Sequence, residues 1–255
     1  MKKEIVKKEF KNEVSTVDES GFDNVGPSQD ITANDIMIPR ILNMQLGSPK
    51  VVEGVAEFGE LRDNLEWELL AAAKKGDTPA KTLEMIPFHW EKYWIIKKLN
   101  GQKYEFETMI KMDRSNQDLD PFEEWVGEDK VKRKRMYLHL FYVLIKGKSI
   151  PYTLGFRGGS KKAGDALVTQ MYTINKQLKN VPAYTSSPMG KVIEVTPVKL
   201  SKDGNNFMAM EIKPLRDSTK EEAIEALIWN KHVSSGKAKV DLTDDDEIVR
   251  DTGEF

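Results

Sequence analysis

The chain has 255 residues, of which 39% are hydrophobic and 31% are charged, and its formal net charge is −2. Cysteine is absent, which excludes a disulfide framework, a thiolate metal site and a cysteine nucleophile. No apolar run approaches the roughly 18–20 residues of a membrane span, and no apolar segment follows the charged N-terminus as in a secretory signal. We therefore expect a cytoplasmic protein that does not enter a membrane.

Residues 1–30 alternate charged and small polar side chains, which predicts a disordered N-terminal segment. We expect residues 31–240 to form a single domain, with its first apolar cluster near Ile36–Leu42. The next stretch, DNLEWELLAAAKKGD, fits either a short helix ended by Gly76 or a strand that leads into a turn. The periodicity leaves both alternatives open.

From residue 81 the pattern is that of β-structure. Aromatic and branched residues fill 81–98, and Asn100-Gly101 is a hairpin signal before a second strand. Residues 113–130 are polar and predict a loop. The strongest predicted strand is 133–147, in which alternation separates two faces. One carries Met136, Leu138, Leu140, Tyr142 and Leu144, and the other carries Arg135, Tyr137, His139, Phe141 and Val143.

The last third combines helices and a hairpin. Residues 161–180 have helical spacing, with an apolar face of Ala166, Leu167, Met171, Ile174 and Leu178. Asp203-Gly204 predicts a tight turn between two strands. A second helix should begin at Ser218 as N-cap, with Glu221 completing a capping box, and end near Gly236.

The expected fold is mainly β with added helices: an antiparallel β-barrel like the oligonucleotide-binding (OB) fold, flanked by disordered termini. A different barrel or an α+β sheet would give a similar pattern.

The charges are distributed unevenly. Residues 1–129 have a net charge of −9 and residues 192–255 a net charge of −5, whereas residues 130–191 hold 13 bases and a single acid, Asp165. We call residues 130–191 the basic block. Its net charge of +12 favours a polyanionic partner.

Signals for catalysis are weak. His89, His139 and His232 lie far apart, without partners at metal-ligand spacing, so structural roles are favoured. No phosphate-loop or dinucleotide motif occurs in the sequence. We expect neither an enzyme nor a bound cofactor or metal.

The basic block interleaves cations with flat rings, as single-stranded nucleic acid requires for its phosphates and unpaired bases. The alternative is that the rings pack in the core and the cations are only solvated. A second cluster, on the strand 81–98, places Phe88, Trp90, Lys92 and Trp94 on one predicted face; Trp90 and Trp94 could stack on bases or pack in the core. Trp229 is interpreted as a packing anchor. The candidate DNA-binding residues are Trp90, Lys92, Trp94, Lys132, Arg133, Lys134, Arg135, Tyr137, His139, Phe141, Arg157, Lys161 and Lys162.

Residues 241–255 hold seven acids and one base, Arg250, and the last residue is Phe255. Such a segment cannot bury enough apolar surface to order itself, so it predicts a disordered acidic tail. A terminal aromatic beside a carboxylate can enter an apolar pocket of a partner. The residues expected to contact a partner are Asp244, Asp245, Asp246, Glu247, Asp251, Glu254 and Phe255.

An aromatic and basic β domain followed by DDDEIVRDTGEF resembles the phage-encoded single-stranded DNA-binding proteins of replication. IMIPRILNMQLGSPK and the FHWEKYW strand are also similar to proteins of that class. Two features depart from the bacterial counterparts: Ile248, Val249 and Arg250 interrupt the acidic run, and Gly253 replaces a proline before the last pair.

The resemblance implies an OB-fold core that coats and protects single-stranded DNA in replication, recombination and repair. It also implies that the tail competes with DNA and recruits replication proteins such as polymerase or primase-helicase. A homodimer is compatible with the sequence. Three alternative functions remain: a strand-annealing recombinase, a double-stranded or RNA-binding module, and a non-enzymatic inhibitory or structural phage protein. The sequence contains neither the recognition helix nor the RNA-binding signature that the second would need.

Overall fold

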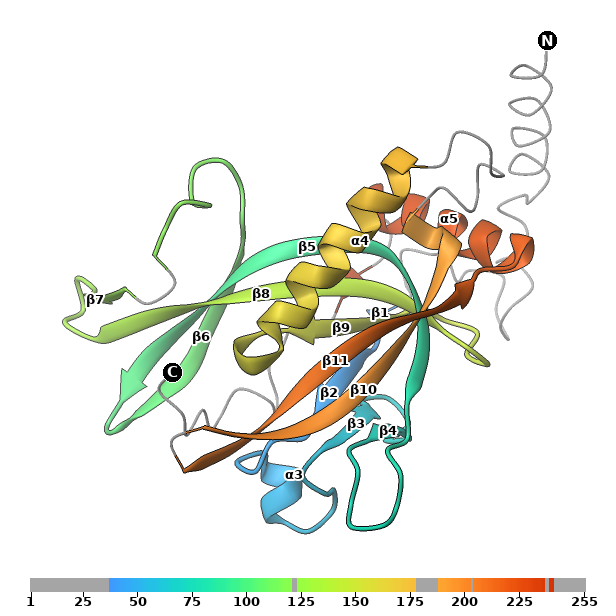
Figure 1. The fold of residues 1–255 in the computed structure, drawn as a ribbon. Coiled ribbons are helices and arrows are strands. Elements are labelled where there is room, and N and C mark those ends of the chain that lie inside the picture. The colour runs from blue at the N-terminus through green and yellow to red at the C-terminus, as the bar shows by residue number, and fades with distance from the viewer. Residues whose placement is uncertain (1–36, 121–122, 178–187, 203, 237–238, 241–255) are drawn as a thin grey trace, which may run out of the picture.

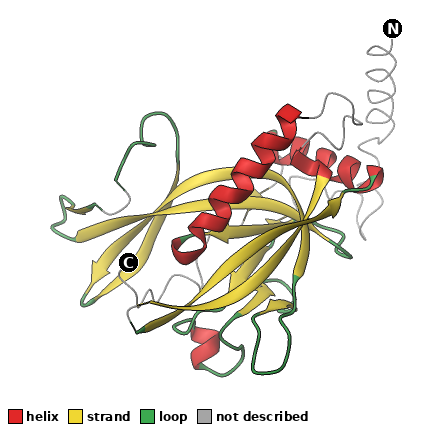
Figure 2. Cartoon of the chain, viewed as in Figure 1, coloured by secondary structure: helices red, strands yellow, loops and turns green. Residues whose placement is uncertain are grey.

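The computed structural model of the chain describes residues 37–120, 123–177, 188–202, 204–236 and 239–240. The fold is mainly β: ten strands form one mixed sheet, with helices on both of its faces (Figures 1 and 2). The main path of hydrogen-bonded strands is β11 (Asn205–Asp217), β10 (Lys191–Lys202), β5 (Leu83–Asn100), β8 (Lys132–Ile145), β9 (Tyr152–Phe156), β2 (Arg40–Asn43), β3 (Glu60–Asp63) and β4 (Leu69–Ala72).

Two further strands extend the long central pair. β6 (Lys103–Lys111) pairs with the outer half of β5, and β7 (Glu124–Val126) pairs with the start of β8. The pairing of β2 with β9 is parallel and the other pairings of this sheet are antiparallel. A separate parallel pair joins β1 (Met37–Ile38) to β12 (Lys239–Val240).

The described strands do not close into a barrel, because β11 and β4 stand at opposite ends of the path and do not pair. The expectation of a closed barrel is therefore wrong. The side chain of Gln45 instead bridges to the edge of β11: its Nε2 donates to the Met208 carbonyl at 3.1 Å, and its Oε1 accepts from the Met208 amide at 2.9 Å. This side-chain bridge satisfies edge groups of β11 that a further strand would otherwise pair.

Two hydrophobic cores lie on opposite faces of β5 and β8. The first contains Phe141 and Val143 and is covered by α4 (Lys161–Gln177) through Leu167 and Met171. The second is covered by α5 (Lys220–Ser234) through Ala226 and Trp229. Figure 1 shows α4 crossing the sheet as a separate layer. Because each helix covers one face, both faces of β8 are buried along its second half.

The second core receives the five apolar residues that alternation assigned to one face of β8, which confirms that assignment. They are Met136, Leu138, Leu140, Tyr142 and Leu144. The anchoring role predicted for Trp229 is also confirmed, since its side chain is buried there.

The short helices are α3 (Pro49–Val52), η2 (Gly158–Ser160) and η3 (Pro188–Gly190).

Both hairpins are present where turn chemistry predicted them. Asn100 pairs with Lys103, and Gly101 has φ of 62°. Lys202 pairs with Asn205, and Gly204 has φ of 81°. Positive φ at these positions is the reason for glycine. Asp203 lies outside the described residues.

Three local predictions need correction. The stretch after Asp63 forms a turn and β4, so the helix alternative is wrong. The second helix begins one residue later than expected: Thr219 is the N-cap and Glu222 completes the capping box, while Ser218 is buried and donates to the Met189 carbonyl at 2.8 Å.

The third correction concerns Phe88, which packs in the core under α5 and does not share a face with Trp90. The register between β5 and β8 shifts between Pro87 and His89, and this bulge reverses the alternation. Proline in a central strand is itself a signal of such an irregularity.

Candidate nucleic-acid interface

One face of the β5–β8 pair collects most of the predicted binding residues. The antiparallel register places Trp90 opposite Phe141, Lys92 opposite His139 and Trp94 opposite Tyr137. Directly opposed residues share a face, and side chains two apart on one strand share it too. We call this the aromatic–basic face, and it consists of Trp90, Lys92, Trp94, Arg135, Tyr137, His139 and Phe141.

Two rings of the aromatic–basic face belong to the interior. Phe141 is 0% exposed and packs on Phe156, which corrects its predicted role because it offers no surface to a base. Trp94 is 3% exposed, and its indole Nε1 donates to the Asn116 carbonyl at 2.9 Å. For Trp94 the core alternative therefore holds.

Trp90 and Tyr137 are only half-buried, and each carries a lysine over its ring. The ammonium of Lys92 lies 5.2 Å from the Trp90 ring centre, and that of Lys161, at the start of α4, lies 5.1 Å from the Tyr137 ring centre. We call Trp90, Lys92, Tyr137 and Lys161 the ring-and-lysine patch. The patch combines partly exposed π faces with cations. Its residues come from β5, β8 and α4, which are separate segments of the sequence.

His139 lies between these two rings. Its ring centre is 6.1 Å from that of Trp90 and 4.6 Å from that of Tyr137, both in edge-on geometry. The side chain is buried, and Nε2 lies 2.8 Å from Oδ1 of Asp165. Gly164 packs against the imidazole so closely that a Cβ would lie 2.9 Å from its Cδ2. The structure thus supports a positioning role for His139, as a support beneath the rings.

The protonation states follow from this packing. Burial is the largest effect on His139 and lowers its pKa; Lys92 and Lys161 lower it further, and Asp165 opposes them. Partial burial alone would raise the pKa of Asp165, but hydrogen bonds from Lys161 and His139 outweigh it and hold that pKa below the usual value. Burial, followed by the charge of Asp165, raises the pKa of Tyr137 to about 12. At neutral pH, neutral His139 therefore donates from Nε2 to the Asp165 carboxylate.

The +12 charge of the basic block is largely compensated in space. Acids from outside the block reach most of its strand and turn cations, and Asp165 pairs with Lys161 at 2.7 Å. The ion pairs from outside the block include Lys132–Glu124, Arg133–Glu107, Arg135–Glu123, Lys146–Glu84, Lys148–Glu66 and Lys191–Asp217. Net charge along the sequence therefore overstates the positive surface that a polyanion would meet.

Other predicted cations are not brought into the ring-and-lysine patch. Arg133 is held by Glu107 and Asp129, each through two hydrogen bonds of 2.7 Å. Lys132 and Lys134 alternate to the opposite face of β8, where Lys134 lies 4.4 Å from the Tyr104 ring centre.

Three further predictions concern the surroundings of the patch. Arg157 is half-buried just before η2, and Lys162 is exposed beside Lys161.

The tail residues 241–255 and the N-terminal segment 1–30 lie outside the described residues. No described helix has the length and apolar character to span a membrane.

A polar cluster lies on the other face of β5. The Glu91 carboxylate accepts from the hydroxyls of Tyr93 at 2.7 Å and Tyr142 at 2.8 Å, and it contacts Lys111. Burial would raise the pKa of Glu91, but the polar contacts with His89, Lys111 and the two tyrosines together outweigh it and lower that pKa strongly. The cluster anchors the β5–β6–β8 region through an ionised, half-buried carboxylate.

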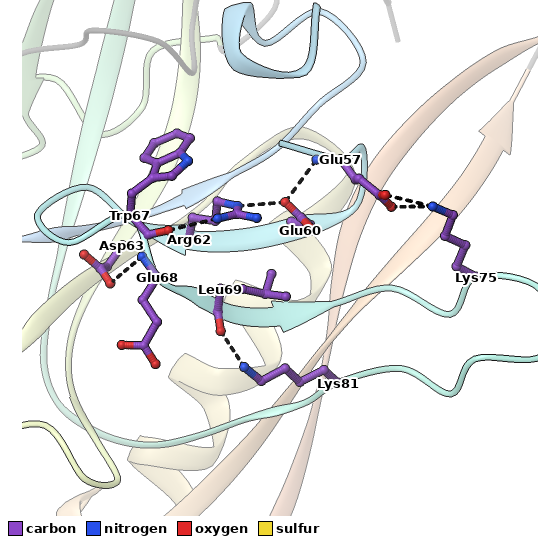
Figure 3. A network of polar contacts seen from close by, with 9 residues as sticks. All are labelled: Glu57, Glu60, Arg62, Asp63, Trp67, Glu68, Leu69, Lys75 and Lys81. Atoms are coloured by element: carbon purple, nitrogen blue, oxygen red, sulfur yellow. Dashed lines mark hydrogen bonds and ion pairs between the residues drawn. The ribbon is translucent and has the colours of Figure 1, made fainter. Parts of the chain in front are cut away.

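A second polar network organises the turn between β3 and β4 (Figure 3). The Asp63 carboxylate accepts from the amides of Leu65 at 2.9 Å and Glu68 at 3.2 Å. Arg62 donates to the Trp67 carbonyl at 2.9 Å. Asp63, Glu66 and Glu68 are close enough to hold a cation, but the Lys148 ammonium already lies 3.2 Å from Glu66 and also contacts Glu68. The protein's own lysine thus occupies the position between Glu66 and Glu68.

Comparison of the chain with protein-family models, with curated proteins and with solved structures found no match.

Three side chains that shape the interface are not predicted from the sequence. Asp165 stands out there only as the single acid of its block, and the sequence places Glu123 and Trp125 in a polar loop. Trp125 lies on β7, 4.6 Å from the Arg135 guanidinium, and Glu123 pairs with that guanidinium at 3.0 Å. The sequence signal for the Glu123–Arg135 pair is charge complementarity, because the acidic run 123–129 directly precedes the basic run 130–135.

Proposed function

We propose that this protein binds single-stranded DNA without sequence preference, through the ring-and-lysine patch. The observation that carries the proposal is the pairing of a half-buried ring with a lysine at two adjoining places, Trp90 with Lys92 and Tyr137 with Lys161. Stacking on such rings accepts any base, because every base has a π face, and the cations attract the phosphates. The protein would act by binding alone, without catalysis.

The proposed cellular role is to coat and protect single strands in DNA replication, recombination and repair. The resemblance described above suggests this role, together with recruitment of replication proteins through residues 241–255. We propose that the curled ten-stranded sheet is an open variant of an OB-like binding fold. The predominance of strand over helix in the described residues favours this function over a strand-annealing recombinase, which we expect to contain more helix.

The proposal is tested by titrating the protein with oligo(dT), a duplex of the same length and the matching RNA, while tryptophan fluorescence is recorded. We expect the tightest binding to the DNA single strand. Affinity should fall with salt, with a slope near −0.7 for each phosphate contacted. Equal or tighter binding of the duplex would contradict the proposal.

A further inference from the structure

Arg135 is a buried arginine whose donors are mostly unused. Its side chain is 9% exposed, and only Nη2 meets a carboxylate, that of Glu123 at 3.0 Å. Among the described residues, Nε and Nη1 have no hydrogen-bond partner. A guanidinium binds a phosphate through two parallel hydrogen bonds either from Nε and Nη2 or from Nη1 and Nη2. Glu123 therefore occupies Nη2, the donor that both arrangements need. Burying donors such as Nε and Nη1 without acceptors is costly.

The segment that covers Arg135 is acidic and is held mainly by polar contacts, among them Lys132–Glu124 and Arg133–Asp129. We call residues 123–131 the acidic arm; it includes β7 and carries Glu123 and Trp125 over the guanidinium. β7 has three residues and, among the described strands, pairs only with β8. Val126 at its end is 62% exposed. A strand this short, with little buried apolar surface, is among the first elements to open locally.

We propose that Arg135 is a phosphate-binding subsite and that Glu123 occupies it as an internal competitor until the acidic arm moves away. Arg135 lies two residues from Tyr137 on the same face of β8, so the subsite continues the ring-and-lysine patch along the strand. The proposal deepens the function proposed above and rests on it for the identity of the ligand, the phosphate backbone of single-stranded DNA.

The first test compares Glu123→Gln with Glu128→Gln. Both changes remove one negative charge from the acidic arm, but Glu128 forms no ion pair among the described residues. We expect Glu123→Gln to tighten oligo(dT) binding about two- to five-fold at low salt, the range of an ion pair with one half-exposed partner. The Glu128→Gln protein should change less. An affinity for Glu123→Gln no tighter than that of Glu128→Gln would overturn the proposal.

The second test locks the arm in place. Val126 and Lys132 are directly opposed in the antiparallel β7–β8 pair, where Cα atoms lie about 4.5–5.5 Å apart, within reach of a disulfide. The chain has no cysteine of its own, so Val126→Cys with Lys132→Cys gives a single bond. Lys132 is absent from both the oxidised and the reduced form, so its loss does not contribute to a difference between them. We expect the oxidised form to bind oligo(dT) about ten-fold more weakly, the loss of one charge-assisted contact. Equal affinity of the two forms would contradict the proposal.

A third titration separates this proposal from the proposed function. If neither the unmodified protein nor Glu123→Gln binds oligo(dT), the proposed function fails. The Arg135 subsite is then judged with inorganic tripolyphosphate, measured by calorimetry on the Glu123→Gln and Glu128→Gln proteins. Tighter tripolyphosphate binding by Glu123→Gln supports an anion subsite released from its competitor. Equal binding by both variants overturns it.

Discussion

Asp165, the only carboxylate between residues 130 and 191, points its Oδ1 at Nε2 of buried His139 at a distance of 2.8 Å. Its other oxygen, Oδ2, accepts from Lys161 at 2.7 Å. One side chain therefore fixes the imidazole beneath the two rings and also neutralises the lysine that lies over Tyr137. Removal of the Asp165 carboxylate is therefore expected to lower stability but to strengthen DNA binding.

Asp165→Asn should lower the free energy of unfolding by about 1 kcal/mol, because His139 loses a charge-assisted partner. The same change should tighten oligo(dT) binding at low salt, since Lys161 no longer has a carboxylate beside it. Denaturant unfolding and a fluorescence titration measure the two effects. Asp217→Asn is the matched control, because it also removes a carboxylate from a lysine, Lys191, that lies outside the ring-and-lysine patch. Equal DNA affinity of both variants would show that Asp165 does not limit binding.

Ring and charge contributions to DNA binding should separate. Trp90→Ala and Tyr137→Ala should each weaken oligo(dT) binding by about 1–3 kcal/mol with little change in the salt dependence, because stacking involves no counterion release. Lys92→Ala and Lys161→Ala should reduce the salt slope. Lys199→Ala is the control, since Lys199 also lies over a ring, that of Phe58. A reduced slope in the ring variants would count against stacking.

The Glu91 cluster predicts how stability depends on pH. The pKa of Glu91 is lower in the folded protein than the unfolded value of 4.5, so the folded state binds fewer protons at acidic pH. Its contribution is therefore complete above about pH 4.5 and is lost as the pH falls below that value. Glu91→Gln should lower the thermal midpoint at pH 7, and its difference from the unmodified protein should shrink toward pH 3. A difference that is constant over this range would exclude the mechanism.

The tail has two separable predicted roles. Deleting residues 241–255 should tighten oligo(dT) binding, most clearly at low salt, because a tethered polyanion competes at high effective concentration. Phe255→Ala should leave DNA affinity nearly unchanged and abolish recruitment of replication proteins, because an aromatic anchor carries much of the energy of such contacts. DNA titration and pull-down of replication proteins from the same source test both variants. If the deletion weakens DNA binding, the tail is not a competitor.

Local patterns predicted much of the fold. The alternation within β8, the turns at Asn100-Gly101 and Gly204, and the helix at 161–177 depend on neighbouring residues, and the structure confirms them. The open sheet could not be predicted in the same way. It depends on which distant edges meet, and on the Gln45–Met208 bridge between residues 163 positions apart.

The candidate site could be predicted only in part. Sequence spacing correctly grouped Lys92 with Trp90, and Tyr137 with His139. It could not show that α4 covers Phe141, or that carboxylates outside the basic block pair with Arg133 and Arg135. Charge along a sequence is additive, whereas the field at a surface depends on which charges tertiary pairing brings together.

The central claim is that single-stranded DNA lies on the ring-and-lysine patch, and ultraviolet cross-linking to oligo(dT) tests it most directly. Cross-linked peptides, identified by mass spectrometry, should come from residues 83–100 and 132–145, with the modified positions at Trp90 and Tyr137. Cross-links confined to other parts of the chain, such as Phe207 on the β10–β11 hairpin, would contradict the account.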